Sequence, residues 1–451
     1  MGDFAPHTEA EIEAMLGFLG LERLDDLFAH IPAAVRLAGG LDLAPGRPEA
    51  EVLDTIAELA DRNRPCGAGL GPGHLVCFAG GGAYEHEIPS AVRALAGQSG
   101  LLTSYTPYQP ELSQGVLQAL FEYQTMLCRL TGMEVANASL YDGASAAVEG
   151  LNLAAAATGR RLAWVSRGVR PAVRAVINTL CNPRLEIREA PLTGGITAWP
   201  DDLGEPAALL MAYPNHLGAL DDVAAAAERA HGAGALLVVG ADPVAAGLLR
   251  SVGALGADVA VGEGQPLGTP LAFGGPYVGL FATRQAPFVR RWLPGRLVGE
   301  GADAEGRRAY VLTLSTREQH IRRAHASSNV CTNQTLVAIT MALHLAWLGP
   351  GGLRELALRC ARGARYAREA LLAIRGVEPA IPAATLYEFP LRTPRPAAAV
   401  LERLAEDGFL GGLDLGLDYP ELGEAILVTV TETRTRVEID AFATAFEKAV
   451  G

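Results

Sequence analysis

The stretch between residues 257 and 283 has the composition of a reactive loop at the edge of a sheet. A short apolar strand, residues 257–261, is followed by a Gly- and Pro-rich loop and by a second strand, residues 277–283. A loop that leaves the end of a sheet strand is where α/β enzymes usually place a reactive side chain. Enzymes that bind a carbonyl cofactor as a Schiff base often carry the attached lysine there. The side chain at the centre of this loop therefore decides which chemistry the chain can support.

The centre of the loop holds Gln265 and no lysine. The only lysine of the chain is Lys448, three residues from the C-terminus, where we expect a solvated tail residue. Because an amide nitrogen is no nucleophile at neutral pH, the chain cannot form a Schiff base in this loop. The sequence therefore argues strongly against a self-sufficient Schiff-base enzyme.

Two tyrosines and a glutamine lie in a second segment whose side chains could take part in binding or catalysis. Tyr105, Tyr108 and Gln109 alternate with Pro107 and Pro110, which forbid a regular helix until after Pro110. Aromatic hydroxyls held in such an ordered, extended segment can reach into a cleft and hydrogen-bond a ligand. Packing in an interface, with the hydroxyls satisfied there, explains the same composition, and the residues alone do not choose between the two.

A third candidate is a turn of small residues before a predicted helix. Asp142, Gly143 and Ser145 precede the small-residue helix expected over residues 146–157. Free backbone N–H groups point outward at a helix N-terminus, so this turn is a plausible phosphate cup. It is equally an ordinary helix cap. The glycine run at residues 80–82 has neither P-loop nor dinucleotide spacing and predicts a tight turn.

Composition and charge exclude several classes of protein. At 451 residues, with 49% hydrophobic and 19% charged residues, the chain is predicted to fold as a globular protein with a large and a smaller domain. Its net charge of −13 disfavours nucleic-acid binding. No apolar run long enough to span a bilayer and no signal pattern are recognised, so we expect a cytoplasmic protein without a membrane partner.

The six cysteines and the glycine pattern exclude further kinds of site. No C-x-x-C pair is present, which favours reduced thiols over a disulfide framework or a zinc site, and no metal is expected. No G-x-G-x-x-G follows a strand, so no nicotinamide cofactor is expected either.

One region departs from the acidic average. Between Arg284 and Arg323 the chain has nine arginines against four acidic residues. A solvated surface with intrachain ion pairs explains this composition, and so does a docking surface for an acidic partner or an anionic group.

Short apolar runs alternate with helical patterns through the middle of the chain. This alternation predicts a mostly parallel sheet with helices on both faces. After residue 323 two long helices lead into a second alternation of strands and helices, which predicts a small α+β domain. We therefore divide the chain into a helical N-terminal arm (1–75), a large α/β domain (76–330), and connecting helices with the small C-terminal domain (331–451). The strands of the large domain are expected at residues 162–165, 185–189, 207–213, 235–239, 257–261 and 277–283, and its helices at 171–179, 221–231 and 244–250.

Several long motifs give the chain a family resemblance. The large parallel-sheet domain followed by a small α+β domain resembles the fold-type I pyridoxal-phosphate (PLP) enzymes. The motifs are similar to those of the glycine cleavage system P-proteins, glycine dehydrogenase (decarboxylating), and in particular to the alpha-type subunit of their split, two-subunit form. They are SYTPYQPELSQG (104–115), GQPLGTPLAFGGP (264–276), PGRLVG (294–299), STREQHIRR (315–323) and NVCTNQ (329–334).

The resemblance implies a reaction and a set of partners. P-proteins use PLP to decarboxylate glycine and pass the aminomethyl group to the lipoyl arm of the H-protein. In the split form the resemblance places the PLP lysine on the beta subunit, at the position that Gln265 occupies here. It therefore implies a cofactor-free alpha subunit that completes one active site with its beta subunit.

The resemblance also suggests roles for individual residues. Tyr105 and Tyr108, with Gln109, would enter the interface active site and position the cofactor phosphate or the substrate carboxylate. Asp142, Gly143 and Ser145 would be the remnant of a phosphate cup. The motif residues Arg317, His320 and Arg322 would be docking residues or structural ion pairs. A purely structural or stabilising subunit, with no residue in the active site, is the alternative.

Overall fold

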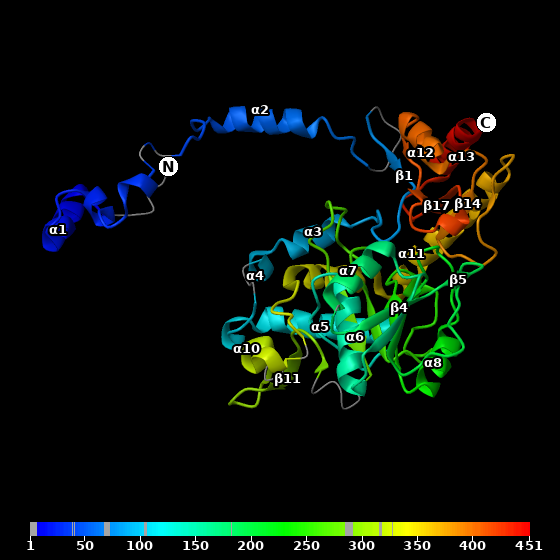
Figure 1. The fold of residues 1–451 in the computed structure, drawn as a ribbon, viewed down its shortest axis with the longest axis horizontal. Helices are drawn as coiled ribbons and strands as arrows, with labels where there is room; N and C mark the ends of the chain where they lie inside the picture. The colour runs from blue at the N-terminus through cyan, green and yellow to red at the C-terminus, as the bar shows by residue number, and fades with distance from the viewer. Residues whose placement is uncertain are drawn as a thin grey trace. The chain divides into compact units, whose positions relative to one another are not determined.

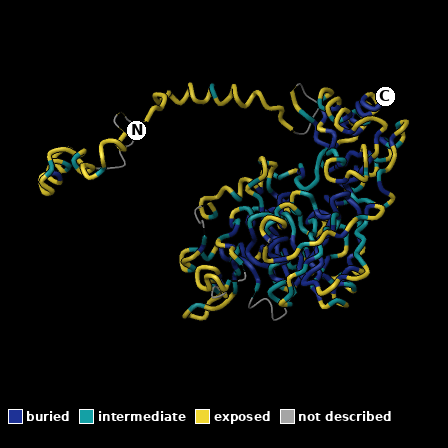
Figure 2. Tube along the Cα trace, in the orientation of Figure 1, coloured by how far each residue is buried: buried dark blue, intermediate teal, exposed yellow. Residues whose placement is uncertain are grey.

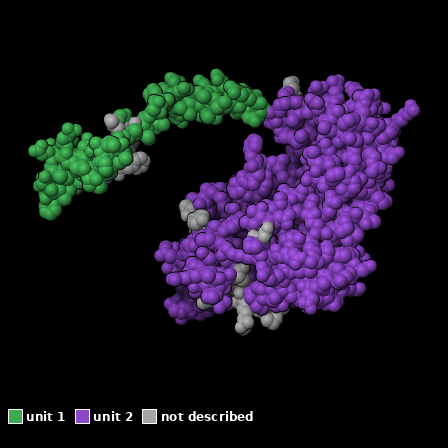
Figure 3. All heavy atoms as spheres, viewed as in Figure 1, with its two compact units in different colours: residues 1–63 green, residues 64–451 purple. Residues whose placement is uncertain are grey.

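The structure of the chain, a computed structural model, forms two compact units. They are residues 1–63 and residues 64–451, coloured separately in Figure 3. The first unit is helical, and the second holds all strands of the described chain (Figure 1). The structure describes residues 7–37, 39, 41–66, 73–102, 106–181, 183–284, 292–314, 318–326 and 328–451.

The first unit consists of helices α1 (Glu9–Leu19) and α2 (Glu49–Ala60) with short turns between them. Thr8 and Glu11 have the sequence spacing that predicts a capping box, and α1 has one, because the Thr8 hydroxyl accepts from the Glu11 N–H and the Glu11 carboxylate accepts from the Thr8 N–H. The sequence also predicts a helix over residues 21–30, and this prediction is wrong: only the 3-10 turn η1 (Leu24–Phe28) forms. The Asp26 carboxylate accepts from the Glu22 and Arg23 N–H groups as part of a capping box, which fixes where this turn begins.

The second unit is built on a seven-stranded sheet. Strands β3, β4, β7, β8 and β9 are parallel, and β10 pairs antiparallel with both β9 and β2, so the mostly parallel sheet is as predicted. In sheet order the strands are β2 (Val135–Ala136), β10 (Gly279–Thr283), β9 (Val259–Glu263), β8 (Leu236–Ala241), β7 (Pro206–Tyr213), β3 (Leu162–Ser166) and β4 (Glu186–Ala190).

Helices cover both faces of this sheet because its strands are apolar on both sides. Along β7, Ala208 and Leu210 face one hydrophobic cluster, whereas Leu209 and Met211 face another. The first cluster includes residues of α6 (Gly143–Thr158) and α7 (Pro171–Cys181), and the second includes residues of α5 (Gln114–Thr131), α8 (Val223–Gly232) and α11 (Thr335–Leu372). The buried sheet appears as the dark interior of Figure 2. The helix predicted over residues 244–250 is reduced to the 3-10 turn η4 (Ala245–Gly247).

Helix α11 links the large sheet to the C-terminal part of the chain. It is long and apolar enough, by length and composition, to cross a membrane. The helix is broken at Gly349, whose φ of 59° is non-helical and which precedes Pro350. Residues on both sides of the break, such as Met341 and Cys360, lie in the protein core. We therefore read α11 as a core helix with two segments, close to the two helices predicted there.

The C-terminal part is a small α+β structure, as the sequence predicts. A four-stranded antiparallel sheet has the order β13-β14-β17-β16 and packs with α12 (Ala397–Glu406) and α13 (Arg436–Val450). Its strands are β13 (Glu378–Pro379), β14 (Glu388–Arg392), β16 (Leu413–Asp414) and β17 (Ala425–Thr429). The hairpin of β11 (Val298–Ala302) and β12 (Arg308–Leu312) was not predicted.

Candidate functional site

The carboxyl ends of the parallel strands open into a cavity. In folds of this kind ligands bind outside the carboxyl ends of the strands. The cavity is lined by the segments that follow β3, β7 and β8, by the end of β9, by the N-terminus of α6, and by the beginning of β14. It thus brings Glu263, just before Gln265, and Gly143 of the sequence-predicted phosphate cup to one place. Its polar lining includes Tyr84, Arg170, His216, Asp242, Glu263, Tyr387 and Glu388.

Gln265 does not project into this cavity as a reactive group, because its amide is held by backbone. The side chain is 1% exposed. Its Oε1 accepts from the Tyr84 N–H at 2.9 Å, while its Nε2 donates to the Tyr84 carbonyl at 2.9 Å and to the Thr269 carbonyl at 2.8 Å. Every strong donor and acceptor of the amide except one oxygen lone pair is thereby used. Gln265 fastens the loop after β9 to the segment that carries Tyr84.

Glu263, two residues earlier, occupies the N-terminus of α6. Its Oε2 accepts from the Gly143 N–H at 2.9 Å, and its Oε1 accepts from the Gln265 and Val278 N–H groups at 3.0 and 3.1 Å. A β-carbon added to Gly143 would lie 3.0 Å from the Glu263 Cβ, so glycine permits this approach. Burial raises the pKa of Glu263, and the three backbone hydrogen bonds offset that effect only in part. An acidic side chain of the chain itself thus occupies the place of an anion.

The predicted cup residues Asp142 and Ser145 bind each other. Asp142 is the N-cap of α6: its carboxylate accepts from the Ser145 N–H at 2.7 Å and from the Ser145 hydroxyl at 3.2 Å. This is the geometry of an ordinary helix cap. In the structure these two side chains therefore form a helix cap, which was the alternative to the phosphate cup.

A second group of side chains joins the cavity to the C-terminal domain. The buried Tyr84 hydroxyl donates to Glu388 at 2.9 Å, and Glu388 also accepts from the Gly81 N–H at 2.7 Å and from the Thr429 hydroxyl at 3.0 Å. The Tyr387 hydroxyl donates to Asp242, which in turn caps the turn after β8. Burial raises the pKa of Glu388 above its ordinary value.

Two basic side chains complete the cavity. Arg170 donates to the Gly82 carbonyl at 2.8 Å and lies over the Tyr84 ring. His216 is buried and stacked on Tyr419, and its Nδ1 has no hydrogen-bond partner among the residues that the structure describes. Burial, followed by the charges of Arg170 and Arg174, lowers the pKa of His216 to about 3, so this imidazole is neutral at pH 7.

These residues do not fit the PLP that the family resemblance implies. A glutamine stands where a Schiff-base lysine would be needed, and the Gly143 N–H that would bind a phosphate oxygen is bound to Glu263. Asp242 is the type of residue that pairs with a pyridinium nitrogen, yet Tyr387 and two backbone N–H groups engage it. The side chain of Gln265, the Gly143 N–H and the Asp242 carboxylate are thus all engaged within the chain.

Tyr108 lies outside this cavity, in a separate cluster around Arg296. Its ring is 61% exposed, and its hydroxyl accepts from Arg296 Nη2 at 3.0 Å with the guanidinium over the ring. Arg296 is also paired with the buried carboxylate of Glu318 and donates to the Cys331 carbonyl. His320 lies 3.6 Å from the same Glu318 oxygen. The Arg296–Glu318 pair therefore connects Tyr108, which the sequence assigned to the active site, with His320, which it assigned to docking or to a structural ion pair.

The remaining predicted residues are exposed or lie outside the described part of the chain. Gln109 and Arg322 are exposed on the segments that carry Tyr108 and His320. Tyr105 and Arg317 lie outside the described residues.

The sequence interpretation missed Glu263, Glu388, Asp242 and Arg296. The sequence does point to two of them. Glu263 and Asp242 each lie at or just after the end of an apolar run that predicts a strand, where functional side chains are expected. Arg296 and Glu388 carry no such signal, because their roles depend on partners 22 to 304 residues away.

Comparison with known proteins adds a family to this geometry. A family model described as glycine cleavage system P-protein matches residues 3–446. A protein of Moorella thermoacetica named probable glycine dehydrogenase (decarboxylating) subunit 1 is 47% identical over 447 residues, which cover 98% of either chain. A protein of the same name from Geobacillus kaustophilus is 44% identical, with 97% of either chain covered.

Solved structures agree with the sequence comparisons. A crystal structure of glycine decarboxylase (P-protein) of the glycine cleavage system, in inhibitor-bound form, matches with a TM-score of 0.90 and 46% identity, over 99% of this chain and 100% of that one. A sphingosine-1-phosphate lyase of Burkholderia pseudomallei matches with a TM-score of 0.61 at 17% identity, over 93% and 94% of the two chains, which shows the fold alone. The predicted fold-type I PLP-enzyme fold is confirmed.

Proposed function

Because the chain belongs to the glycine cleavage system P-protein family, we propose that it is subunit 1 of a two-subunit glycine dehydrogenase (decarboxylating). In this proposal PLP is carried by the partner subunit, and the chain described here acts only with that partner. The observation that carries the proposal is the state of the sheet-edge cavity: Gln265 and Glu263 are bound to backbone where a lysine and a phosphate would be required. Relatives named "subunit 1" support the existence of a partner.

The surface around Tyr108 is the part of the chain that we assign to the partner's active site. Tyr108 is exposed although its hydroxyl is fixed by Arg296, so it presents a pre-positioned aromatic group to whatever covers it. Exposed apolar side chains, Leu112 and Ile321 among them, occur on the segments near this cluster. Exposed apolar and aromatic groups around a fixed polar anchor are typical of the core of a protein interface.

The assignment gives the chain's own residues a limited part in the reaction. Tyr108, with Gln109 beside it, would orient an anionic group of the cofactor or substrate at the interface and exclude water from it. The decarboxylation itself belongs to PLP on the partner. The substrate glycine, the lipoylated H-protein as acceptor of the aminomethyl group, and a cytoplasmic location are further parts of this proposal. The basic segment with His320 and Arg322 is the surface that we assign to docking.

The proposal is tested with the purified chain and its partner subunit. The visible absorption spectrum is recorded with added PLP for the chain alone and then for the mixture, and release of CO2 from glycine is measured in both samples. We expect no protein-bound PLP band and no CO2 release from the chain alone, and both from the mixture. A single borohydride-reducible PLP adduct on the isolated chain would overturn the proposal.

The alternative, a purely stabilising subunit, predicts the same spectra but a different response to mutation. If the chain only holds its partner in shape, removal of the Tyr108 hydroxyl leaves turnover of the intact complex unchanged. The exposed and hydrogen-bonded state of Tyr108 favours the active-site role, and the corresponding variant is considered below.

A further inference from the structure

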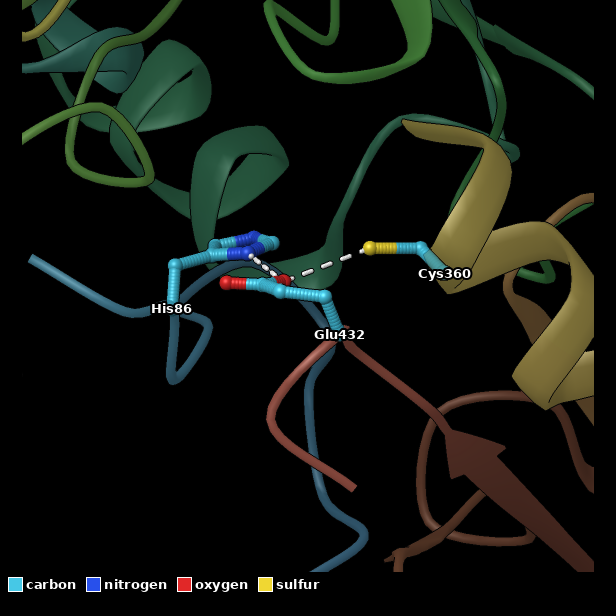
Figure 4. Close-up of side chains that lie close together, drawn as sticks. All are labelled: His86, Cys360 and Glu432. Carbon is cyan, nitrogen blue, oxygen red and sulfur yellow. Dashed lines mark hydrogen bonds and ion pairs between the residues drawn. The ribbon is translucent and has the colours of Figure 1, made fainter. Parts of the chain in front are cut away.

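A second polar cluster lies apart from the residues considered so far, between the segment after Tyr84, the second half of α11 and the segment after β17. It consists of His86, Cys360 and Glu432, whose side chains converge in Figure 4. His86 Nδ1 lies 2.7 Å from Glu432 Oε2, and the Cys360 thiol donates to the same oxygen at 3.4 Å. The His86 and Glu432 side chains are 1% and 7% exposed, and Cys360 is fully buried. Three segments distant in the sequence thus meet at one carboxylate oxygen.

The three side chains are the types that bind zinc. Thiolate, imidazole and carboxylate are the ligands that Zn²⁺ takes in proteins, and tetrahedral coordination puts ligand atoms about 3.3 to 3.8 Å apart. The candidate atoms here all lie within 4.8 Å of one another. A small shift that opens the His86–Glu432 hydrogen bond would therefore bring them to coordinating distances. Within the described part of the chain, no other group of three such residues meets this spacing.

Two buried imidazole nitrogens, one in the cluster and one on the first half of α11, lack a partner. His86 Nε2 and His344 Nδ1 make no hydrogen bond to any residue that the structure describes. His86 and Glu432 both lie near enough to His344 to act on it electrostatically. Buried polar atoms without partners call for an explanation such as an ion.

A divalent cation at this point would displace the thiol proton of Cys360 to solvent and compensate the negative charges of the thiolate and of Glu432.

We propose that His86, Cys360 and Glu432 form a structural site for a zinc-like divalent cation. The ion would tie the segment after Tyr84 and the segment after β17 to α11. The proposal concerns this chain alone and does not depend on the function proposed above. The spacing of the cysteines in the sequence does not predict this site, because Cys360 is its only thiol and the other ligands come from distant segments.

The test uses Co²⁺ as a spectroscopic probe of the full chain after treatment with a chelator. A cobalt–thiolate bond gives a near-ultraviolet charge-transfer band, and tetrahedral coordination gives intense visible bands. We expect both to saturate at one equivalent of Co²⁺ in the wild-type chain and to be displaced by Zn²⁺. Cys360→Ala should lose the charge-transfer band completely. The matched control Cys181→Ala removes a buried cysteine outside the cluster and should keep it.

A further variant guards against loss of folding in Cys360→Ala. His86→Gln keeps the thiol but removes an imidazole ligand, so it should bind Co²⁺ at least about tenfold more weakly. Zn²⁺ should raise the midpoint of thermal unfolding of the wild type and of Cys181→Ala, and leave that of Cys360→Ala unchanged. Absence of a charge-transfer band in the wild type, or a band of equal intensity in folded Cys360→Ala, would overturn the proposal.

Discussion

The carboxylate of Glu263 accepts a 2.9 Å hydrogen bond from the backbone N–H of Gly143, the first residue of α6. This contact fills the helix N-terminus at which the family resemblance predicts a phosphate cup. The missing lysine at position 265 is therefore one of two features that we expect to oppose attachment of PLP. Glu263 is the second, and it has consequences that can be measured.

Restoring the lysine alone is expected to fail. In Gln265→Lys, Glu263 still occupies the α6 N-terminus, so PLP should not become attached in stoichiometric amount. Gln265→Lys combined with Glu263→Ala frees the Gly143 N–H and should bind more PLP. Attachment is measured by borohydride reduction and mass spectrometry. The matched control combines Gln265→Lys with Glu228→Ala, which removes an exposed carboxylate on α8. Equal labelling of the single and double variants would show that Glu263 presents no obstacle.

Removal of the Tyr108 hydroxyl tests the assignment of the Arg296 cluster. Tyr108→Phe keeps the ring but loses the hydrogen bond from Arg296 Nη2. We expect turnover of the assembled complex to fall by about tenfold or more, because a positioning contact at the active site is lost. Tyr366→Phe is the matched control, since Tyr366 also carries a hydrogen-bonded hydroxyl and an overlying arginine, Arg436. Complex formation is followed by size-exclusion chromatography. Normal turnover with Tyr108→Phe would favour the purely stabilising subunit.

The ion pair between Arg296 and Glu318 is expected to contribute strongly to stability. Both side chains are 6% exposed, so Glu318→Gln leaves a buried guanidinium without its counter-charge. We expect the free energy of unfolding to fall by about 3 to 5 kcal/mol, measured by urea denaturation. The control is Glu369→Gln, which breaks the exposed pair with Arg365 and should reduce the free energy of unfolding far less, because solvent screens the two charges. Similar losses for the two variants would contradict the role assigned to the buried pair.

His216 should make stability depend on pH. Its pKa is lowered to about 3 in the folded chain, mainly by burial, whereas in the unfolded chain it titrates near the ordinary value of 6.5. Between these values the unfolded state binds the extra proton, so stability is lost as the pH falls from about 6.5 towards 3, by up to about 1.4 kcal/mol per pH unit. His216→Asn should lose this contribution, and the difference between the two unfolding curves at pH 7 and pH 4.5 measures it. Parallel pH dependence in wild type and variant would rule His216 out.

The sequence by itself determined the architecture and the main chemical limit. Short apolar runs such as those of β7 and β9 form strands because both of their faces are buried, and the capping box at Thr8 defines where α1 begins. The length of short helical elements was less predictable. The segments 21–30 and 244–250 form only 3-10 turns, although Asp26 and Asp242 bind backbone N–H groups as residues at a helix N-terminus do.

The tertiary structure decided how the site residues are engaged. That the loop after β9 contains no lysine can be read from the sequence, because the residue types in a loop do not depend on the fold. Other contacts follow only from the packing of the chain. Glu263 fills the α6 N-terminus, Arg296 links Tyr108 to Glu318, and His86 lies close to Cys360. The partners lie from 22 to more than 100 residues apart in sequence, and only the folded sheet and helix α11 bring them within hydrogen-bonding or coordinating distance.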